Sequence, residues 1–318
     1  MPKTITEYAK WLAERNLRWP TPPKPQPVHA APFTKPIAGL KGVAWDVYGT
    51  LLRIADGELI FQHPQAIRME VALDKTLQEF NLWNSMSRKP GAPWEYLQTL
   101  YTRAYDDLRL AGSGRKGDLT EIDSAKLWRR VLSKMELEKY TYDESLYGDL
   151  DELCEKIAYF FHASLQGIEA SPGALDALKL TSQGGFVQGL VADGQCFTLT
   201  QVLRALEAQG TLPPIGQVLD PSVMTLSYLE GARKPSKSLY QRAAERFRLR
   251  GIEPGQVLFV SARLREDLAV AKSVGFRTAL YAGDKISLKA SVADLKDPTV
   301  KPDRLLTELG QVRDILSL

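Results

Sequence analysis

One apolar run in this chain ends on an acid and is followed at once by a turn. The run Gly42–Trp45 leads into Asp46, and Gly49 and Thr50 come shortly after. A strand that is buried on both faces of a parallel sheet has such a continuous apolar pattern, and its carboxyl end lies at the edge where open α/β folds place their sites. The segment therefore predicts a buried strand that delivers one carboxylate to a sheet edge. A carboxylate placed there can act as a covalent nucleophile.

Further apolar runs repeat this pattern at wide spacing. The runs predicted to be buried strands are Phe186–Ala192, Val257–Ala262 and Arg277–Tyr281, with a shorter strand near Gln217–Leu219. Helical periodicity lies between and after them, over residues 172–184, 197–209, 236–248 and 264–274. Strands that alternate with helices predict an α/β fold, here a Rossmann-like parallel sheet with helices on both faces.

Residues 54–170 interrupt the alternation, because no strand pattern stands out in them. Apolar residues recur there at helical spacing over 64–82, 93–110, 121–137 and 144–166, with a loop at 111–118. This pattern predicts an all-helical cap domain beside the edge of the sheet. The expected domains are an N-terminal helix and Pro-rich strap at 1–38, the α/β core at 39–53 and 171–318, and the helical cap at 54–170.

The two ends of the chain add shorter elements. Thr4 and Glu7 have the spacing of a capping box at the start of an amphipathic helix. Seven prolines then fall within Pro20–Pro36, which predicts an extended connector that straps this helix onto the core. A ligand for a proline-binding partner is the alternative for this segment. In residues 285–318 we expect an irregular strap and a last helix that starts near Pro302.

Composition limits the classes of partner. With 44% hydrophobic and 25% charged residues the chain is an ordinary globular one, and a net charge of +3 is too small to indicate binding to nucleic acid or to a membrane. No apolar run reaches the roughly 18 residues of a membrane span, and the N-terminus lacks the apolar core of a signal peptide. Cys154 and Cys196 have no metal-like spacing. We therefore expect free thiols and a cytoplasmic protein.

Several motifs meet at one sheet edge in the predicted fold. They are Asp46-Val-Tyr-Gly-Thr-Leu, Ser171-Pro-Gly-Ala-Leu, Gly231-Ala-Arg-Lys-Pro-Ser-Lys-Ser-Leu-Tyr240, and Val257-Leu-Phe-Val-Ser followed by Asp267 and Ala271-Lys-Ser-Val-Gly275. In this order and spacing the chain resembles the haloacid dehalogenase-like (HAD) hydrolase superfamily, of the type with a helical cap after the first motif. With Tyr48 two residues after the acid, the first motif is most similar to the 2-haloacid dehalogenase branch.

The resemblance implies a hydrolase that acts on a small molecule. Asp46 would attack the substrate in line and form an ester, which water then hydrolyses. Lys234 of the third motif would hold Asp46 and offset its charge, and Asp267 would anchor Lys234. The residue type suits this chemistry, because a carboxylate needs only positioning and partial desolvation at pH 7. In the alternative, Asp46 and Asp267 merely cap the helices that follow their strands.

Three departures from the family pattern narrow the function. Phosphatases of the superfamily have an acid where Tyr48 stands, which protonates the leaving oxygen, and general acid catalysis contributes about 10²–10⁴ in rate. Halide needs no proton, so Tyr48 favours displacement at carbon. Ala192 replaces a Ser or Thr, and Asp193 replaces an amide, so both count against an anionic substrate. Ala262 replaces an Asp that binds metal.

The third departure bears on cofactors. No cofactor is firmly predicted, and Mg²⁺ is left open with an incomplete ligand set, because Asp46 and Asp267 alone would coordinate it poorly. We hypothesise that Arg263 pairs with Asp193 or Asp46 and supplies the positive charge in place of a metal. In the alternative, Arg263 lies on the solvated face of the next helix.

The remaining candidates are substrate contacts, and the function keeps three alternatives. The predicted substrate-binding residues are Tyr48, Thr50, Arg53, Asp193, Gly194 and Arg263. For Tyr48 the alternative is packing under the cap, and for Arg53 it is a surface position. The chain is expected to be a metal-independent, dehalogenase-like hydrolase, a magnesium-dependent phosphatase, or a catalytically degenerate binding or scaffold protein. The sequence leaves the substrate and the oligomeric state open.

Overall fold

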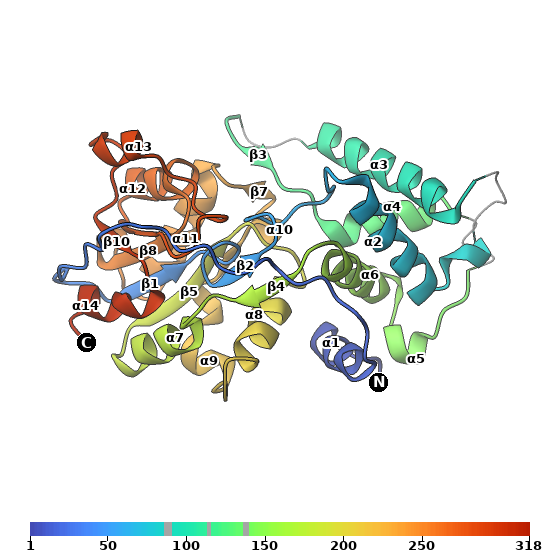
Figure 1. Ribbon diagram of the computed structural model, residues 1–318, viewed down its shortest axis with the longest axis horizontal. Helices are drawn as coiled ribbons and strands as arrows, with labels where there is room; N and C mark the ends of the chain where they lie inside the picture. Colours follow the sequence, from blue (N-terminus) through green and yellow to red (C-terminus); the bar gives the residue numbers. More distant parts are fainter. Residues whose placement is uncertain (86–90, 113–115, 136–139) are drawn as a thin grey trace.

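The computed structural model describes residues 1–85, 91–112, 116–135 and 140–318. A six-stranded sheet in the order β10-β9-β8-β1-β5-β6 forms one part, and a group of helices forms the other (Figure 1). Every neighbouring pair in this sheet is parallel. Its strands are β1 (Gly42–Trp45), β5 (Val187–Ala192), β6 (Thr225–Leu226), β8 (Val257–Ser261), β9 (Arg277–Tyr281) and β10 (Arg304–Leu306). The predicted α/β fold with a parallel sheet is confirmed.

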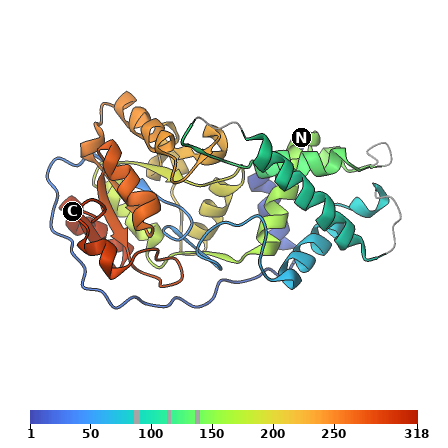
Figure 2. The same ribbon diagram turned by 90° about the horizontal axis from the view of Figure 1, so that it is seen from above.

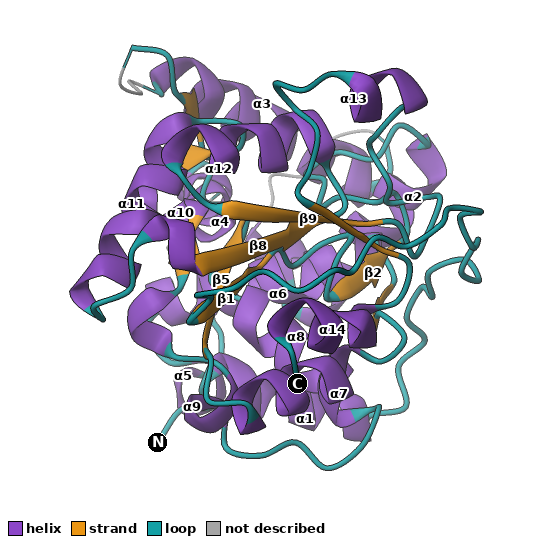
Figure 3. Ribbon diagram, turned by 90° about the vertical axis from the view of Figure 1, so that its left-hand side faces the viewer, coloured by secondary structure: helices purple, strands orange, loops and turns teal. Residues whose placement is uncertain are grey.

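Helices cover both faces of the sheet (Figure 3). One face carries α7 (Ala174–Gln183), α8 (Thr198–Glu207) and α14 (Val312–Leu316), and the other carries α11 (Lys237–Leu249) and α12 (Ala269–Val274). In β1 the side chains of Val43 and Trp45 belong to the apolar cluster on one face of the sheet, and Ala44 belongs to the apolar cluster on the other face. Both faces are therefore dry, which explains why β1 is apolar at every position.

The remaining helices form a region with an apolar cluster of its own. Its members are α1 (Ile5–Glu14), α2 (Ala66–Glu79), α3 (Pro93–Ala111), α4 (Ser124–Ser133), α5 (Glu144–Tyr147) and α6 (Leu150–Leu165). The single helix predicted at 144–166 is interrupted at Gly148, whose φ of 81° lies in the left-handed region. Residues 136–137 of the helix predicted at 121–137, and 113–115 of the predicted loop, lie outside the described residues.

Two short antiparallel ribbons contradict the prediction that residues 54–170 hold no strand. The strand β2 (Leu52–Ile54) pairs with β4 (Ile168–Ala170), and β3 (Leu119–Thr120) pairs with β7 (Ala232–Arg233). Strands of two or three residues are too short to show a periodicity of their own. The β2–β4 ribbon lies where the chain enters and leaves the helical region, while the division into domains stays a prediction.

Two other local predictions were wrong. The strand expected near Gln217–Leu219 is the helical turn α9 (Ile215–Val218), and the strand comes later, at β6. In the tail, β10 adds an edge strand beside β9, so the last helix, α14, starts well after Pro302. Shorter elements are α10 (Ser227–Glu230), α13 (Val292–Lys296), the 3₁₀ turns η1 (Leu82–Ser85), η3 (Pro221–Val223), η4 (Pro254–Gln256) and η6 (Leu309–Gln311), and the π-helical turn η5 (Leu264–Leu268).

The N-terminal segment contacts both parts of the molecule. The predicted capping box is present, with the Glu7 amide donating to Thr4 Oγ1 (3.3 Å) and the Thr4 amide donating to Glu7 Oε2 (2.8 Å). However, α1 packs mainly in the apolar cluster of the helical region. The Pro-rich segment after it runs extended along the molecule (Figure 2) and pairs Phe33 with Leu305 at the edge strand β10.

Candidate active site

Asp46 lies at the switch point of the sheet. In the sheet, β1 lies between β5 on one side and β8 on the other. The loops that follow these strands therefore diverge at the carboxyl edge of the sheet and leave a crevice there. The Asp46 amide continues the ladder by donating to the Val260 carbonyl (2.9 Å), and its Oδ1 accepts from the Val47 amide (2.9 Å). Backbone bonds on both sides thus hold the carboxylate in place, and only 3% of the residue is exposed.

The Lys234 ammonium joins two carboxylates. Its Nζ donates to Asp46 Oδ1 at 2.6 Å and to Asp267 Oδ2 at 2.7 Å. The structure therefore brings the three predicted catalytic residues together, from three different segments of the chain. All three side chains are buried, so little water screens these ion pairs.

Ser261, at the end of β8, completes this cluster. Its hydroxyl lies 3.1 Å from Asp46 Oδ2 and 2.6 Å from Asp267 Oδ2, and it accepts from the Arg263 amide (3.1 Å). Ser261 is not among the predicted catalytic or substrate-binding residues. The signal was a polar residue closing the apolar run Val257–Val260, the same pattern that singled out Asp46.

Burial and the shared ammonium act in opposite directions on the two carboxyls. For Asp46, burial prevails over the attraction of Lys234 and raises its pKa to about 6. For Asp267, Lys234 and Arg263 together outweigh burial and hold its pKa below the ordinary value. The two carboxylates outweigh burial at Lys234 as well, so its pKa is raised. At pH 7 the cluster thus holds an ionised Asp46 and a charged Lys234.

A small cavity of about 20 Å³ lies beside Asp46. Its lining residues are Asp46, Tyr48, Glu58, Leu59, Asp193, Arg233, Lys234 and Arg263. This volume holds about one water molecule. Three of the lining side chains are acidic and three are basic, so the formal charges of the lining balance.

Asp193 holds the backbone of the lysine. Its Oδ1 accepts from the Lys234 amide (2.8 Å), and its Oδ2 lies 4.0 Å from Arg233 Nη2. Burial raises the pKa of this carboxyl, although Lys234 and Arg233 act against it. Asp193 therefore positions Lys234 in addition to lining the cavity, a role that its position after β5 did not reveal.

Arg263 covers the cavity and does not pair as predicted. Its Nη1 lies 3.5 Å from Glu58 and 3.7 Å from Glu266, and its Nη2 donates to the Gly57 carbonyl (3.2 Å). The predicted pairing with Asp193 or Asp46 is therefore wrong, and so is the alternative of a solvated side chain, because only 7% of the residue is exposed. Glu58, which also binds Lys289 (2.9 Å), carried no signal in the sequence.

The structure places the other predicted substrate contacts differently. Tyr48 lines the cavity with its ring, but its hydroxyl donates to Gln201 Oε1 (2.6 Å) and lies 2.9 Å from Thr198 Oγ1. Thr50 accepts from the Ala262 amide (3.1 Å), which ties the turn after β1 to the end of β8. The Gly194 amide donates to a serine of α10. Thr50 and Gly194 do not line the cavity.

Arg53 is not at the cavity either, and it is not on the surface. It pairs with Glu169 (3.1 Å) and Asp284 (3.5 Å) and donates to the Pro23 carbonyl, and only 5% of it is exposed. Its surroundings explain this burial, because two carboxylates and a carbonyl satisfy the guanidinium. Arg53 thus fastens the Pro-rich segment to the β2–β4 ribbon.

The residues at Asp46 do not fit a resident divalent cation. The Lys234 ammonium lies between the two carboxylates that would coordinate it, and Ala262 has no side-chain oxygen. Across the described ranges, no three His, Cys, Asp or Glu side chains are grouped so that they could hold a metal ion. Cys154 and Cys196 are free, as predicted.

Comparison with known proteins agrees with the motifs. Residues 231–312, which contain Lys234 and Asp267, match a family model described as HAD-hydrolase-like. A crystal structure of 2-haloacid dehalogenase from Pseudomonas syringae pv. Tomato DC3000 superposes with a TM-score of 0.53 at 19% identity, over 87% of this chain and 98% of that one. The carboxyl-terminal part of the chain therefore resembles the haloacid dehalogenase-like hydrolases, and its fold is shared with a haloacid dehalogenase.

Two further proteins resemble parts or the whole of the chain. Glyceraldehyde 3-phosphate phosphatase from Pyrococcus furiosus is 25% identical over 145 residues, which is 46% of this chain and 53% of that protein. The chain thus matches only about half the length of this curated relative. L-2-haloacid dehalogenase from Xanthobacter autotrophicus, with chloropropionic acid covalently bound, superposes with a TM-score of 0.41 at 18% identity, over 86% of this chain and 96% of that one. Among the residues that the structure describes, no helix has the length and apolar character needed to cross a bilayer.

Proposed function

We propose that this protein is a metal-independent hydrolase in which Asp46 forms a covalent ester with a small-molecule substrate. The observation that carries the proposal is the buried cluster of Asp46, Lys234 and Asp267. Lys234 keeps Asp46 ionised at neutral pH despite its burial, and a desolvated carboxylate is a better nucleophile than a hydrated one. The helical region then serves as the cap.

The proposed reaction has two steps. The Asp46 carboxylate attacks the substrate carbon, forms a C–O ester bond and expels the leaving group with its electron pair. Water then adds to the carboxyl carbon of this ester, and the C–O bond to that carboxyl carbon breaks. The alcohol product takes one proton of the water, and Asp193, whose pKa is raised by burial, is placed in the same cavity to accept the proton lost during the attack. The carboxylate of Asp46 is thereby regenerated.

Two features of the cavity favour this chemistry. Tyr48 cannot replace the missing general acid, because its hydroxyl is engaged with Thr198 and Gln201 and burial raises its pKa far above neutrality. The leaving group must therefore depart without a proton, as a halide does. The lining offers no excess of positive charge, so the substrate that fits best is uncharged.

Substrate entry requires the segment over the cavity to move. Gly57 and Glu58 are held there by Arg263 and Lys289, and the space beneath them is about 20 Å³. We propose that these contacts open when substrate enters and close again over the ester. Closure of this kind excludes bulk water from the first step.

Hydrolysis of a phosphate ester is the second candidate function. The match to glyceraldehyde 3-phosphate phosphatase favours it, and Arg233, the most exposed cation of the lining, could contact an anionic group. Such a reaction would proceed without an acid at position 48 and would therefore be slow.

An isotope experiment separates the two functions. The protein is incubated in H₂¹⁸O with panels of neutral haloalkyl compounds, haloacids and phosphate esters, with added Mg²⁺ or with EDTA. The mass of the peptide that contains Asp46 is then measured by mass spectrometry. Displacement at carbon places ¹⁸O in the Asp46 carboxylate, because water attacks the carboxyl carbon. Hydrolysis of an aspartyl phosphate at phosphorus leaves the label in the phosphate instead.

Asp46→Asn is the control, and turnover should be lost in it with either substrate class. Turnover that persists in Asp46→Asn would rule out both routes through this carboxylate. No turnover of any compound by the parent protein would leave a binding or scaffold protein as the function.

A further inference from the structure

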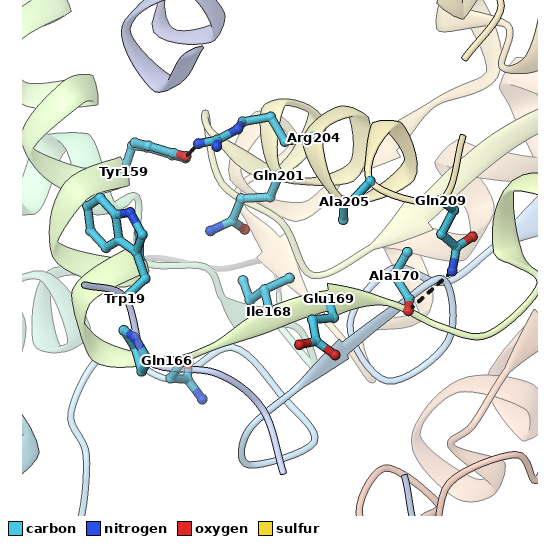
Figure 4. Close-up of a pocket in the computed structure, with 13 residues that line it drawn as sticks. Trp19, Tyr159, Gln166, Ile168, Glu169, Ala170, Gln201, Arg204, Ala205 and Gln209 are labelled. Carbon is cyan, nitrogen blue, oxygen red and sulfur yellow. Dashed lines mark hydrogen bonds between the residues drawn. The ribbon is translucent and has the colours of Figure 1, made fainter. Parts of the chain in front are cut away.

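A larger cavity, separate from Asp46, lies between the N-terminal segment, α6, β4 and α8 (Figure 4). Its volume is about 410 Å³, whereas the cavity at Asp46 measures about 20 Å³. Small-molecule sites in proteins generally fall between about 300 and 1,000 Å³. The larger cavity therefore has the size of a ligand site, and none of its lining residues reaches Asp46.

The polar side chains of this cavity leave one positive charge without a carboxylate. Arg204 of α8 donates through Nη1 to the Tyr159 hydroxyl (2.8 Å), and within the described part of the chain no carboxylate pairs with it. The carboxylate in the lining, Glu169, is already paired with Arg53 at 3.1 Å. Arg204 is therefore the cation of this lining with donors to spare, and those donors can bind two oxygens of one oxyanion.

Another part of the lining is apolar and firmly held. Trp19 packs edge-on against Phe160 with 5.3 Å between ring centroids, and it lines the cavity together with Ile168. The chain next to Trp19 lies directly on Gly167, where an added Cβ would approach the Thr21 carbonyl carbon to 2.4 Å. The indole therefore has a fixed place in which it can contact the flat, apolar body of a ligand.

Gln201 connects this cavity to the site at Asp46. Its side chain extends from α8 into the space between α8 and β4 (Figure 4), and its Oε1 accepts from the Tyr48 hydroxyl at 2.6 Å. The amide nitrogen of Gln201 remains to donate to a ligand. One side chain thus separates a ligand in the large cavity from the ring that lines the small one.

We propose that this cavity binds a small organic anion, with a carboxylate on Arg204 and an aromatic or alicyclic body against Trp19. The negative charge of such a ligand is complementary to Arg204, its apolar surface is complementary to the indole, and its size fits the cavity. Nothing in this inference depends on the reaction proposed for Asp46.

A binding experiment tests the inference. A panel of one- and two-ring carboxylates, including 2-naphthoate, is titrated against the full-length protein by calorimetry, each beside its neutral carboxamide. We expect saturable binding of at least one carboxylate, and weaker binding of its amide. Arg204→Gln should weaken the binding of the carboxylate about tenfold or more, because a charge-assisted bidentate pair is lost. Arg277→Gln, at an exposed arginine of β9, should leave binding unchanged.

Two further variants keep the test decisive. Ala205→Phe fills the cavity from α8 and should block binding even if Arg204→Gln fails to fold, as judged by circular dichroism. Arg233→Gln removes a cation from the Asp46 cavity and should have no effect. The inference is overturned if no member of the panel binds, if Arg204→Gln and Ala205→Phe bind as the parent does, or if Arg233→Gln alone abolishes binding.

Discussion

The two carboxylates that share Lys234 should respond oppositely to neutralisation. Burial raises the pKa of Asp46 from an ordinary 3.8 to about 6, so the folded protein holds the neutral form more readily than the unfolded chain does. The carboxylate of Asp46 therefore costs stability above pH 6, and this cost vanishes below about pH 4. At about 1.4 kcal/mol for each pH unit, the full cost is about 3 kcal/mol.

Asp46→Asn should therefore stabilise the fold at pH 8 by up to about 3 kcal/mol and have little effect near pH 4. The amide can still accept from Lys234 through its oxygen and donate to the Ser261 hydroxyl through its nitrogen, so the local hydrogen bonds survive. Urea unfolding, followed by fluorescence at both pH values, measures the difference. The same substitution should abolish turnover.

Asp267→Asn is the matched control, because the pKa of Asp267 is lowered by the same ammonium. A carboxylate of this kind contributes stability above its unfolded pKa and loses it as the pH falls, so Asp267→Asn should destabilise the protein at pH 8. If Asp46→Asn is instead less stable than the parent protein at pH 8, then Lys234 outweighs burial at both carboxylates and the reasoning fails.

Three other measurements bear on the site and on the packing around it. The kcat/KM should fall about tenfold for each pH unit below pH 6, since the nucleophile is the ionised Asp46, and a flat profile from pH 5 to 8 would contradict this. Lys234→Met should lower the free energy of unfolding by about 3–5 kcal/mol at pH 7, because it leaves buried carboxylates unpaired. This loss of stability, measured by urea unfolding, should become smaller as the pH falls. Gly167→Ala should lower stability by about 1–3 kcal/mol, because the new Cβ would clash with the backbone at Thr21. Gly216→Ala, where a Cβ meets nothing within 4 Å, is its control in thermal unfolding, and equal midpoints for the two variants would exclude the clash.

The fold could be predicted where each strand carries its own signal. The strands β1, β5, β8 and β9 are buried on both faces, so each shows an apolar run that the sequence reveals without knowledge of its partners. The strands β3, β6 and β7 have two residues each, and their pairing partners define them. An edge strand such as β10, only partly buried, lacks the apolar run that identifies the central strands.

In the site, the sequence identified the side chains that follow the strands but not those that reach across loops. Asp46, Lys234 and Asp267 stand at characteristic positions within their motifs, so their meeting could be expected. Glu58 and Arg263 meet because two irregular segments fold toward each other, and no periodicity encodes that. The same holds for Arg53, whose carboxylate partners come from distant parts of the chain.

The position of α1 has a consequence for how the chain is made. Tyr8 of α1 packs among aromatic rings that include Tyr147 and Tyr159, so the apolar cluster of the helical region needs residues from both ends of a long stretch of chain. Roughly 135 residues separate α1 from α6, which at about 5–20 residues per second take about 7–30 s to synthesise. Phe80, whose ring lies 6.3 Å from that of Tyr8, is made early, but the α6 face on which α1 packs is absent throughout that interval. The apolar cluster of the helical region can therefore be completed only after α6 has been translated.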